Sequence, residues 1–117
     1  MTITERRVGD VTLLQLKGRL VFGEGATLLR SHLNDLLDQA RLNFLLDLHE
    51  VTYVDSFGVG VLAAKYVSIR RKGGDLKFLN LSVRSHHVMA ISGLIRIFES
   101  FESEEEALRS FTTARRT

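Results

Sequence analysis

The stretch Phe44-Leu45-Leu46-Asp47-Leu48 is a nearly continuous apolar run near the middle of a chain of 117 residues. Such a run is typical of a β-strand that is covered on both faces, as in a parallel sheet between helices. Strand-like and helix-like segments alternate on both sides of it, which predicts an α/β fold with right-handed crossovers. We therefore expect a central mixed β-sheet with an N-terminal hairpin and about four α-helices packed against it.

Two short strands and a helix are predicted before this run. The strands cover residues 3–8 and 11–17, and the Gly9-Asp10 pair between them suits a two-residue hairpin with a positive φ at the glycine. Residues 26–41 carry apolar side chains at helical spacing, which gives the predicted helix one apolar face. These side chains are Leu29, Leu33, Leu36, Leu37 and Ala40.

Strand–helix units continue after the central run. A helix over residues 57–71 ends at Gly73-Gly74, and a strand follows over residues 76–81. Ser82 then begins a short helix that runs to Gly93. The positions of this short helix that we expect to be buried are Val83, Val88 and Ile91.

The C-terminal part of the chain is predicted to add one more strand and one more helix. The strand is Ile95-Arg96-Ile97-Phe98. The helix begins at Ser103, whose spacing to Glu106 is that of a capping box. Its packing face consists of Ala107, Leu108 and Phe111. We find no repeat or linker, so residues 1–117 are expected to form one domain.

Composition excludes several classes of protein. The chain has no cysteine, which rules out a disulfide framework, a thiolate metal site and a cysteine nucleophile. Its N-terminus does not resemble a signal peptide, and no apolar stretch approaches the roughly 20 residues that span a bilayer. The formal net charge is only +2 and the basic residues are scattered, which disfavours a nucleic-acid partner. We therefore expect a cytoplasmic protein without membrane insertion.

The segment most indicative of function is residues 51–62, Val-Thr-Tyr-Val-Asp-Ser-Phe-Gly-Val-Gly-Val-Leu. It follows the central strand and opens the next helix, at the sheet edge where α/β proteins usually place their sites. Asp55 and Ser56 stand where a helix cap belongs, so one of them could simply be the cap. Gly58 and Gly60 lie in the first helical turns, where each costs about 1 kcal/mol relative to alanine. Either close packing on the sheet or close approach of a partner would offset that cost.

No other residues form a convincing active site. The surroundings of Ser56 are not a nucleophile elbow, which needs glycine two residues before the serine. His86 and His87 are adjacent and would point in different directions on a helix, so they cannot share a metal ion as an i, i+4 pair does. Gly23-Glu24-Gly25 lacks the lysine of a phosphate-binding loop. We expect no enzyme activity, no cofactor and no metal.

At this point the sequence resembles a known family. Residues 54–62 are similar to the Asp-Ser-small-Gly-Leu-Gly signature of STAS domains, specifically those of bacterial anti-sigma-factor antagonists. The similarity extends to Gly18-Arg19-Leu20, to Gly73-Gly74 and to Ser92-Gly93-Leu94. The resemblance implies a single STAS domain over residues 1–117.

The resemblance also implies a partner-switching function. Such antagonists bind an anti-sigma factor that is also a serine kinase, which frees the sigma factor for transcription. The kinase phosphorylates the serine after the aspartate, here Ser56, and the antagonist is released until a phosphatase restores it. The domain is then the substrate rather than the enzyme, and a monomer or weak homodimer. The implied partner-binding residues are Asp55, Ser56, Phe57, Gly58, Val59 and Gly60, with Arg19, Val21 and Phe22 from the loop that borders them.

Three residues depart from the family pattern. Phe57 stands where the family usually has a small residue, while Arg19 and Val21 stand where Glu and Asp are common. We interpret these differences as a changed partner preference. The alternative is a constitutive STAS scaffold without phosphorylation, either in a signalling assembly or as a subunit of a lipid-transport complex.

Overall fold

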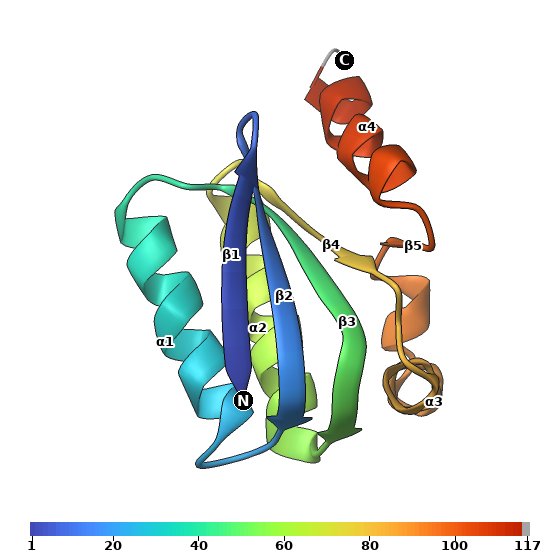
Figure 1. The fold of residues 1–117 in the computed structure, drawn as a ribbon. Coiled ribbons are helices and arrows are strands. Elements are labelled where there is room, and N and C mark those ends of the chain that lie inside the picture. Colours follow the sequence, from blue (N-terminus) through green and yellow to red (C-terminus); the bar gives the residue numbers. More distant parts are fainter. Residues whose placement is uncertain (116–117) are drawn as a thin grey trace.

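The computed structural model describes the backbone of residues 1–115 and contains one five-stranded sheet (Figure 1). The strands lie in the order of the sequence, and β1 pairs antiparallel with β2, whereas all other neighbours are parallel. The strands are β1 (Thr2–Val8), β2 (Val11–Leu20), β3 (Asn43–Val54), β4 (Asp75–Leu79) and β5 (Ser100–Phe101). The helices are α1 (Gly25–Asp38), α2 (Ser56–Arg71), α3 (Val83–Ser92) and α4 (Glu104–Arg115), with a 3₁₀ turn at Leu94–Arg96. The predicted mixed sheet with an N-terminal hairpin and four helices is confirmed.

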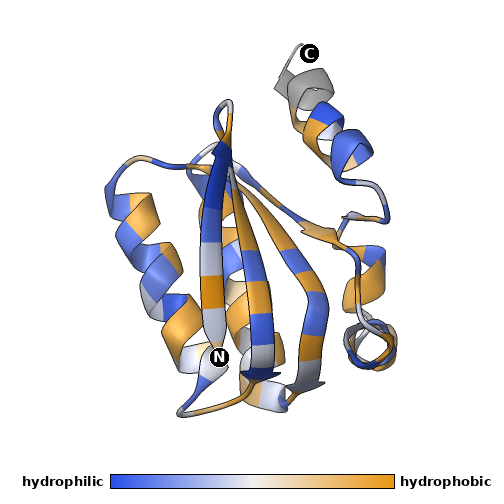
Figure 2. Cartoon of the chain, in the orientation of Figure 1, coloured by the Kyte–Doolittle hydropathy of each residue, from blue (hydrophilic) through white to orange (hydrophobic). Residues whose placement is uncertain are grey.

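Two apolar clusters cover the two faces of the sheet. In Figure 1, α2 lies behind β1 and β2, and α1 lies next to it, to the left of β1. The buried side chains of both helices pack on alternate residues of the strands. Helix α4 packs on the other face through a smaller cluster. Because successive strand residues point to opposite faces, Phe44 and Leu46 belong to the first cluster and Leu45 to the second. Figure 2 shows a continuous apolar stretch in the first half of β3 and an alternation of polar and apolar residues in its second half. The central run is therefore covered on both faces, as predicted.

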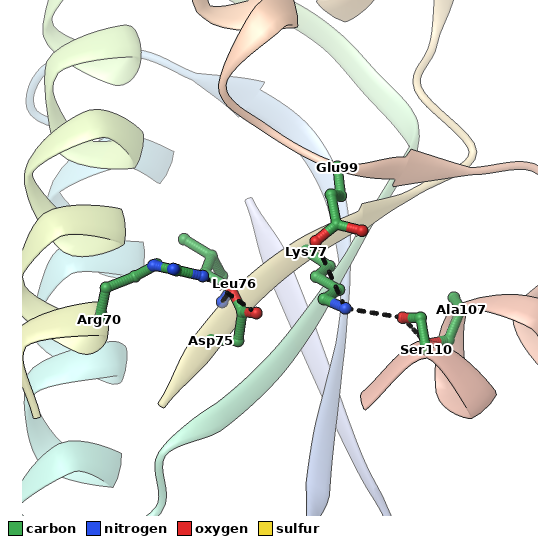
Figure 3. A network of polar contacts seen from close by, with 7 residues as sticks. All are labelled: Arg70, Asp75, Leu76, Lys77, Glu99, Ala107 and Ser110. Carbon is green, nitrogen blue, oxygen red and sulfur yellow. Dashed lines mark hydrogen bonds and ion pairs between the residues drawn. The ribbon is translucent and has the colours of Figure 1, made fainter. Parts of the chain in front are cut away.

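A buried lysine helps to fix α4 on the sheet (Figure 3). The Lys77 side chain is only 3% exposed, and its Nζ donates a hydrogen bond to the Ser110 Oγ at 2.9 Å. The same Nζ lies 3.5 Å from the Glu99 carboxylate and 4.8 Å from the centre of the Phe111 ring. The ammonium group therefore has a hydrogen bond, a counter-charge and an aromatic ring in place of water.

Most ends of helices and strands coincide with local sequence signals. The hairpin turn places Gly9 at φ +62°, and Gly73 closes α2 at φ +88°. Ser82 accepts a hydrogen bond from the backbone N–H of Ser85 at 3.1 Å, which makes it the N-cap of α3. These features agree with the predictions for the hairpin and for both helix ends.

The predicted strand over residues 95–98 is wrong. Gly93 ends α3 in a left-handed conformation (φ +80°), and the chain at once forms a 3₁₀ turn in which the Ile97 N–H donates to the Leu94 carbonyl. The Phe98 side chain is buried against the Tyr66 and Phe78 rings, with centroids 5.1 and 4.7 Å away. Phe98 therefore packs directly after a helical turn, Ile97 is left exposed, and the last strand is β5, two residues further on.

The burial predicted for α3 needs correction as well. Val83 and Ile91 are 90% and 73% exposed, while Val88 is partly buried. The helix instead buries Ser85 and Met89, one turn apart, because it lies beside the sheet and presents a narrow face to β3. A helix at the margin of a sheet leaves most of its circumference to solvent.

Strands β2 and β3 are longer than predicted. Their parallel pairing continues beyond Gln15 through two irregularities of register and ends with the pair Leu20 and Val54. Residues 51–54 are therefore the last part of β3 rather than the start of a loop. This extension brings the end of β3 directly next to the end of β2.

Candidate functional site

The predicted site residues gather where β2 and β3 end. The chain leaves β2 at Leu20 and enters α1 after a short loop, and it leaves β3 at Val54 and enters α2 at Ser56. Because Leu20 and Val54 are paired, the β2–α1 loop lies beside the first turn of α2. We call residues 19–24 and 53–60 together the Ser56 edge. It contains all nine residues predicted from the sequence to bind a partner: Arg19, Val21, Phe22, Asp55, Ser56, Phe57, Gly58, Val59 and Gly60.

Asp55 joins the two segments of the Ser56 edge. Its Oδ1 accepts a hydrogen bond from the Gly58 N–H at 2.8 Å, which caps α2, and its Oδ2 accepts one from the Phe22 N–H at 3.0 Å in the β2–α1 loop. Burial alone would raise the pKa of the Asp55 carboxyl, but the N–H groups of Phe22, Gly58 and Phe57 together hold this pKa below its ordinary value of 3.8. The carboxylate is thus a charged link between loop and helix.

Ser56 is the first residue of α2, and its side chain is exposed. Asp55, and not Ser56, is the cap, so the question left open by the sequence is resolved. Within the described part of the chain, the Ser56 hydroxyl makes no hydrogen bond. It lies at the positive end of the helix dipole, where an added anion is favoured.

The two glycines of α2 have different surroundings. A Cβ atom on Gly58 would lie 2.2 Å from the Leu20 carbonyl oxygen, so this glycine permits the helix to pack against the end of β2. A Cβ atom on Gly60 would have nothing within 4 Å, and Gly60 is exposed. Packing explains Gly58 and leaves the glycine at position 60 without an explanation inside the fold.

Aromatic side chains flank the serine. The Phe22 and Phe57 rings meet edge to face with centroids 5.0 Å apart, and the Arg30 guanidinium lies 5.7 Å from the centre of the Phe57 ring. Phe22 is 70% exposed, so this edge presents an aromatic ring to solvent beside the serine. Val21, in contrast, is buried, so it supports this surface from below.

Tyr53 and Arg84 lie at the same place, and neither was predicted from the sequence to be a site residue. The Arg19 and Arg84 guanidinium carbons lie 5.7 and 5.2 Å from the centre of the Tyr53 ring. Tyr53 lies within residues 51–62, the segment that the sequence analysis considers most indicative of function. Arg84 comes from α3, and no local sequence pattern connects it to residues 19 and 53. Only the packing of α3 beside β3 brings these side chains together.

Other groups considered from the sequence remain apart. His86 and His87 are exposed on α3, and the described residues contain no cluster of three or more His, Asp or Glu side chains that could hold a metal ion. No helix within residues 1–115 has the length and apolar character needed to cross a membrane. The Ser56 edge combines an exposed hydroxyl, a helix N-terminus and an aromatic pair of which Phe22 is exposed and Phe57 partly buried, an arrangement suited to binding a protein and to accepting a phosphate.

Comparison with known proteins gives consistent matches. A family model described as the STAS domain matches residues 2–107. The chain is 25% identical to the anti-sigma F factor antagonist of Paenibacillus polymyxa over 99 residues, which cover 84% of each protein. It is 35% identical to the anti-sigma-B factor antagonist of Bacillus subtilis over 74 residues, which cover 63% of this chain and 67% of the relative.

Solved structures with similar folds include the anti-sigma factor antagonist SpoIIAA in its unphosphorylated form. It has a TM-score of 0.77 and 22% identity, and the match covers 92% of this chain and 93% of that one. The phosphorylated form of SpoIIAA, a cell fate determinant of Bacillus, has a TM-score of 0.73 and 21% identity, and the match covers 93% and 98%. At these identities the likeness establishes the fold.

Proposed function

The chain belongs to the STAS domain family, and from this premise we propose that it is an anti-sigma-factor antagonist controlled by phosphorylation of Ser56. It binds an anti-sigma factor that is also a serine kinase, and this binding releases a sigma factor. Phosphorylation of Ser56 ends the binding, and a phosphatase restores it. The protein is a substrate in this cycle rather than an enzyme, and it acts in the cytoplasm as a monomer or weak homodimer.

The observation that carries this proposal is the exposed Ser56 hydroxyl directly after the capping Asp55. A kinase can reach this hydroxyl without opening the fold, because the cap is supplied by its neighbour. A phosphate there adds about −1.5 to −2 charges at a helix N-terminus, which tolerates anions. The fold is therefore expected to survive a modification that changes the surface strongly.

The partner surface continues from Ser56 along α2. Gly60, Ala64 and Val67 follow Ser56 at helical spacing, and all four residues are exposed. The missing side chain at Gly60 permits a partner backbone to approach the helix closely. Close approach of a partner would therefore explain why position 60 is a glycine, which no contact inside the fold requires.

The negative charge of a phosphate on Ser56 can release the bound partner. Changing a complex from mostly bound to mostly free requires about 5.5 kcal/mol of differential binding. A like-charge contact at about 4 Å contributes roughly 4 kcal/mol at an effective dielectric constant of 20. One such contact with the phosphate, together with its steric bulk beside Phe57, is sufficient.

Binding of three forms to the anti-sigma factor tests the proposal. We expect Ser56→Ala to bind with the wild-type affinity and to stay bound when ATP is added, because no phosphate can form. We expect Ser56→Glu to bind at least tenfold more weakly in calorimetry. Thr4→Glu, an exposed hydroxyl replaced on β1, is the matched control and should bind normally. Equal affinities for wild type and both Ser56 variants would remove Ser56 from the mechanism.

The exposed Phe22 ring, paired with the partly buried Phe57, favours a second candidate, the constitutive scaffold or transport subunit. A permanent apolar contact would bury both rings regardless of phosphorylation. Size-exclusion chromatography of native material distinguishes the two functions. A permanent large assembly supports the scaffold, whereas a free monomer or dimer supports the switch.

A further inference from the structure

Three exposed side chains from distant parts of the sequence meet at the Ser56 edge, two from the edge itself and one from α3. Arg19 comes from the end of β2, Tyr53 from the end of β3 and Arg84 from the first turn of α3. Both guanidinium groups lie over the Tyr53 ring, at 5.7 and 5.2 Å from its centre. We call these three residues the Arg–Tyr–Arg cluster.

The positive charge of the cluster is only partly neutralised within the described part of the chain. Arg84 forms no ion pair there, and Arg19 has one acidic neighbour, Glu24, at 3.9 Å. That distance is too long for a hydrogen bond, and both side chains of this pair are more than half exposed. Two like charges held near one ring repel each other, so an anion between or beside them would stabilise the arrangement.

The geometry also leaves the donor groups available. A guanidinium beside a ring can keep its N–H groups free to bind a carboxylate by two hydrogen bonds. Both guanidinium carbons lie within the roughly 6 Å range of a cation–π contact with Tyr53, which is itself 43% exposed, and this contact favours these arginine positions before any partner arrives. A binding site whose side chains are already ordered loses less entropy on association.

We propose that the Arg–Tyr–Arg cluster binds an acidic segment of the anti-sigma factor, with the Asp or Glu carboxylates of that segment held by the edges of Arg19 and Arg84. This inference rests on the proposed function for the identity of the partner, whereas the acidic chemistry follows from the cluster itself. Tyr53 lies two residues before Asp55, so the acidic segment binds beside the surface that Ser56 controls. The cluster therefore determines which anti-sigma factor is recognised.

A first experiment tests the chemistry without the natural partner. Hexaglutamate peptide is titrated into ¹⁵N-labelled full-length protein, and the arginine Nε–Hε signals are followed by NMR. We expect Arg19 and Arg84 to shift most, together with the backbone amide of Tyr53, and we expect the Tyr53 amide shift to be lost in the double variant Arg19→Gln/Arg84→Gln. Shifts of equal size at Arg7 and Arg71, two exposed arginines elsewhere, would overturn the proposal. An equally strong response of the cluster to hexathymidylate would overturn the assignment to an acidic protein in favour of nucleic acid.

A second experiment uses the anti-sigma factor. Arg19→Glu and Arg84→Glu should each weaken binding about tenfold or more, with a reduced dependence on salt, because each places a carboxylate against the acidic segment. Arg84→Lys should recover part of the affinity, since it keeps the charge but loses the planar fork. Arg7→Glu is the matched control: Arg7 pairs with Thr12 near the start of β2, at the opposite end of the strand from Arg19.

The two experiments separate the inference from the proposed function. Wild-type protein that binds hexaglutamate at the cluster but binds no anti-sigma factor would overturn the function and support the cluster. Wild-type protein whose affinity for the anti-sigma factor is unchanged by Arg19→Glu and Arg84→Glu would overturn the cluster and leave the function intact. The ¹H–¹⁵N spectrum of each variant verifies that it is folded.

Discussion

Asp55 determines the shape of the candidate site because one carboxylate accepts two backbone hydrogen bonds from different segments. An asparagine in its place has a single acceptor oxygen, so either Phe22 or Gly58 loses its partner. We expect Asp55→Asn to lower the free energy of unfolding by about 1–3 kcal/mol in urea denaturation. Asp35→Asn, on the exposed side of α1, is the control and should change it by less than about 0.5 kcal/mol.

The same carboxylate makes stability depend on pH. The pKa of Asp55 is lower in the folded protein than its ordinary value of 3.8, so its contribution is present above that value and is lost as the pH falls through the folded pKa. The stability difference between wild type and Asp55→Asn should therefore be largest near neutral pH and shrink in strong acid. A difference that stays constant down to acid denaturation would contradict this role of the charge.

Gly58 and Gly60 form a matched pair of substitutions. Gly58→Ala should destabilise the protein by about 1–3 kcal/mol, because the new Cβ collides with the Leu20 carbonyl. Gly60→Ala should stabilise it by up to about 1 kcal/mol, because alanine favours the helix and its Cβ meets nothing. Thermal unfolding measures both changes. If Gly60→Ala binds the anti-sigma factor as tightly as wild type, the close approach of a partner at position 60 is wrong.

At the scale of single residues, the sequence was informative where function depends on neighbours in the chain. The cap, the serine and the first helical turn are consecutive, so their order alone placed Asp55 and Ser56 at a helix start. The choice between them as cap required the structure, because both residue types are good caps. The distinction between Gly58 and Gly60 also required it, because only the position of the Leu20 carbonyl separates them.

Among the elements, α4 has the most unusual attachment to the sheet, through the buried Lys77. Lys77→Met would replace the ammonium by an apolar chain of similar length, between Phe101 and Phe111. Glu99 is 59% exposed and returns to water, and the Ser110 hydroxyl keeps its bond to the Ala107 carbonyl. We expect this variant to match or exceed the wild-type stability, because the desolvated charge is removed together with its need for partners.

A complementary substitution at Glu99 removes the counter-charge of Lys77 and keeps the lysine. Glu99→Ala leaves the buried ammonium with Ser110 and the aromatic rings alone, so we expect it to be less stable than Lys77→Met by about 1 kcal/mol or more in urea denaturation. The reverse order of stability would show that Lys77 attaches α4 through Ser110 and the aromatic rings even without Glu99, and would contradict this account.

Elements were predictable in proportion to how strongly their own residues specify them. The hairpin at Gly9 and the central strand have local signals of turn and burial, and both are confirmed. The segment 95–98 is as apolar as a strand, but the turn imposed by Gly93 decides its conformation. The exposure of Val83 and Ile91 depends on where α3 lies relative to the sheet, and no pattern within α3 contains that information.

At the scale of the whole molecule, the topology of the sheet brings the residues of the candidate site together. Parallel pairing of β2 and β3 brings the β2–α1 loop to the start of α2, and the placement of α3 beside β3 adds Arg84 to Tyr53. The first of these follows from the predicted α/β order of elements. The second could not be predicted, because residues 53 and 84 are linked only through tertiary packing.

The central claim is that Ser56 carries a phosphate that controls partner binding. The most direct test is intact-mass analysis of the protein purified from its native host, with peptide mapping across residues 51–62 and a Ser56→Ala strain as control. We predict one phosphate, located on Ser56, that disappears under conditions that induce the sigma factor and is absent from the control strain. A chain that never carries phosphate on Ser56 under any of these conditions would contradict the account and favour the constitutive scaffold.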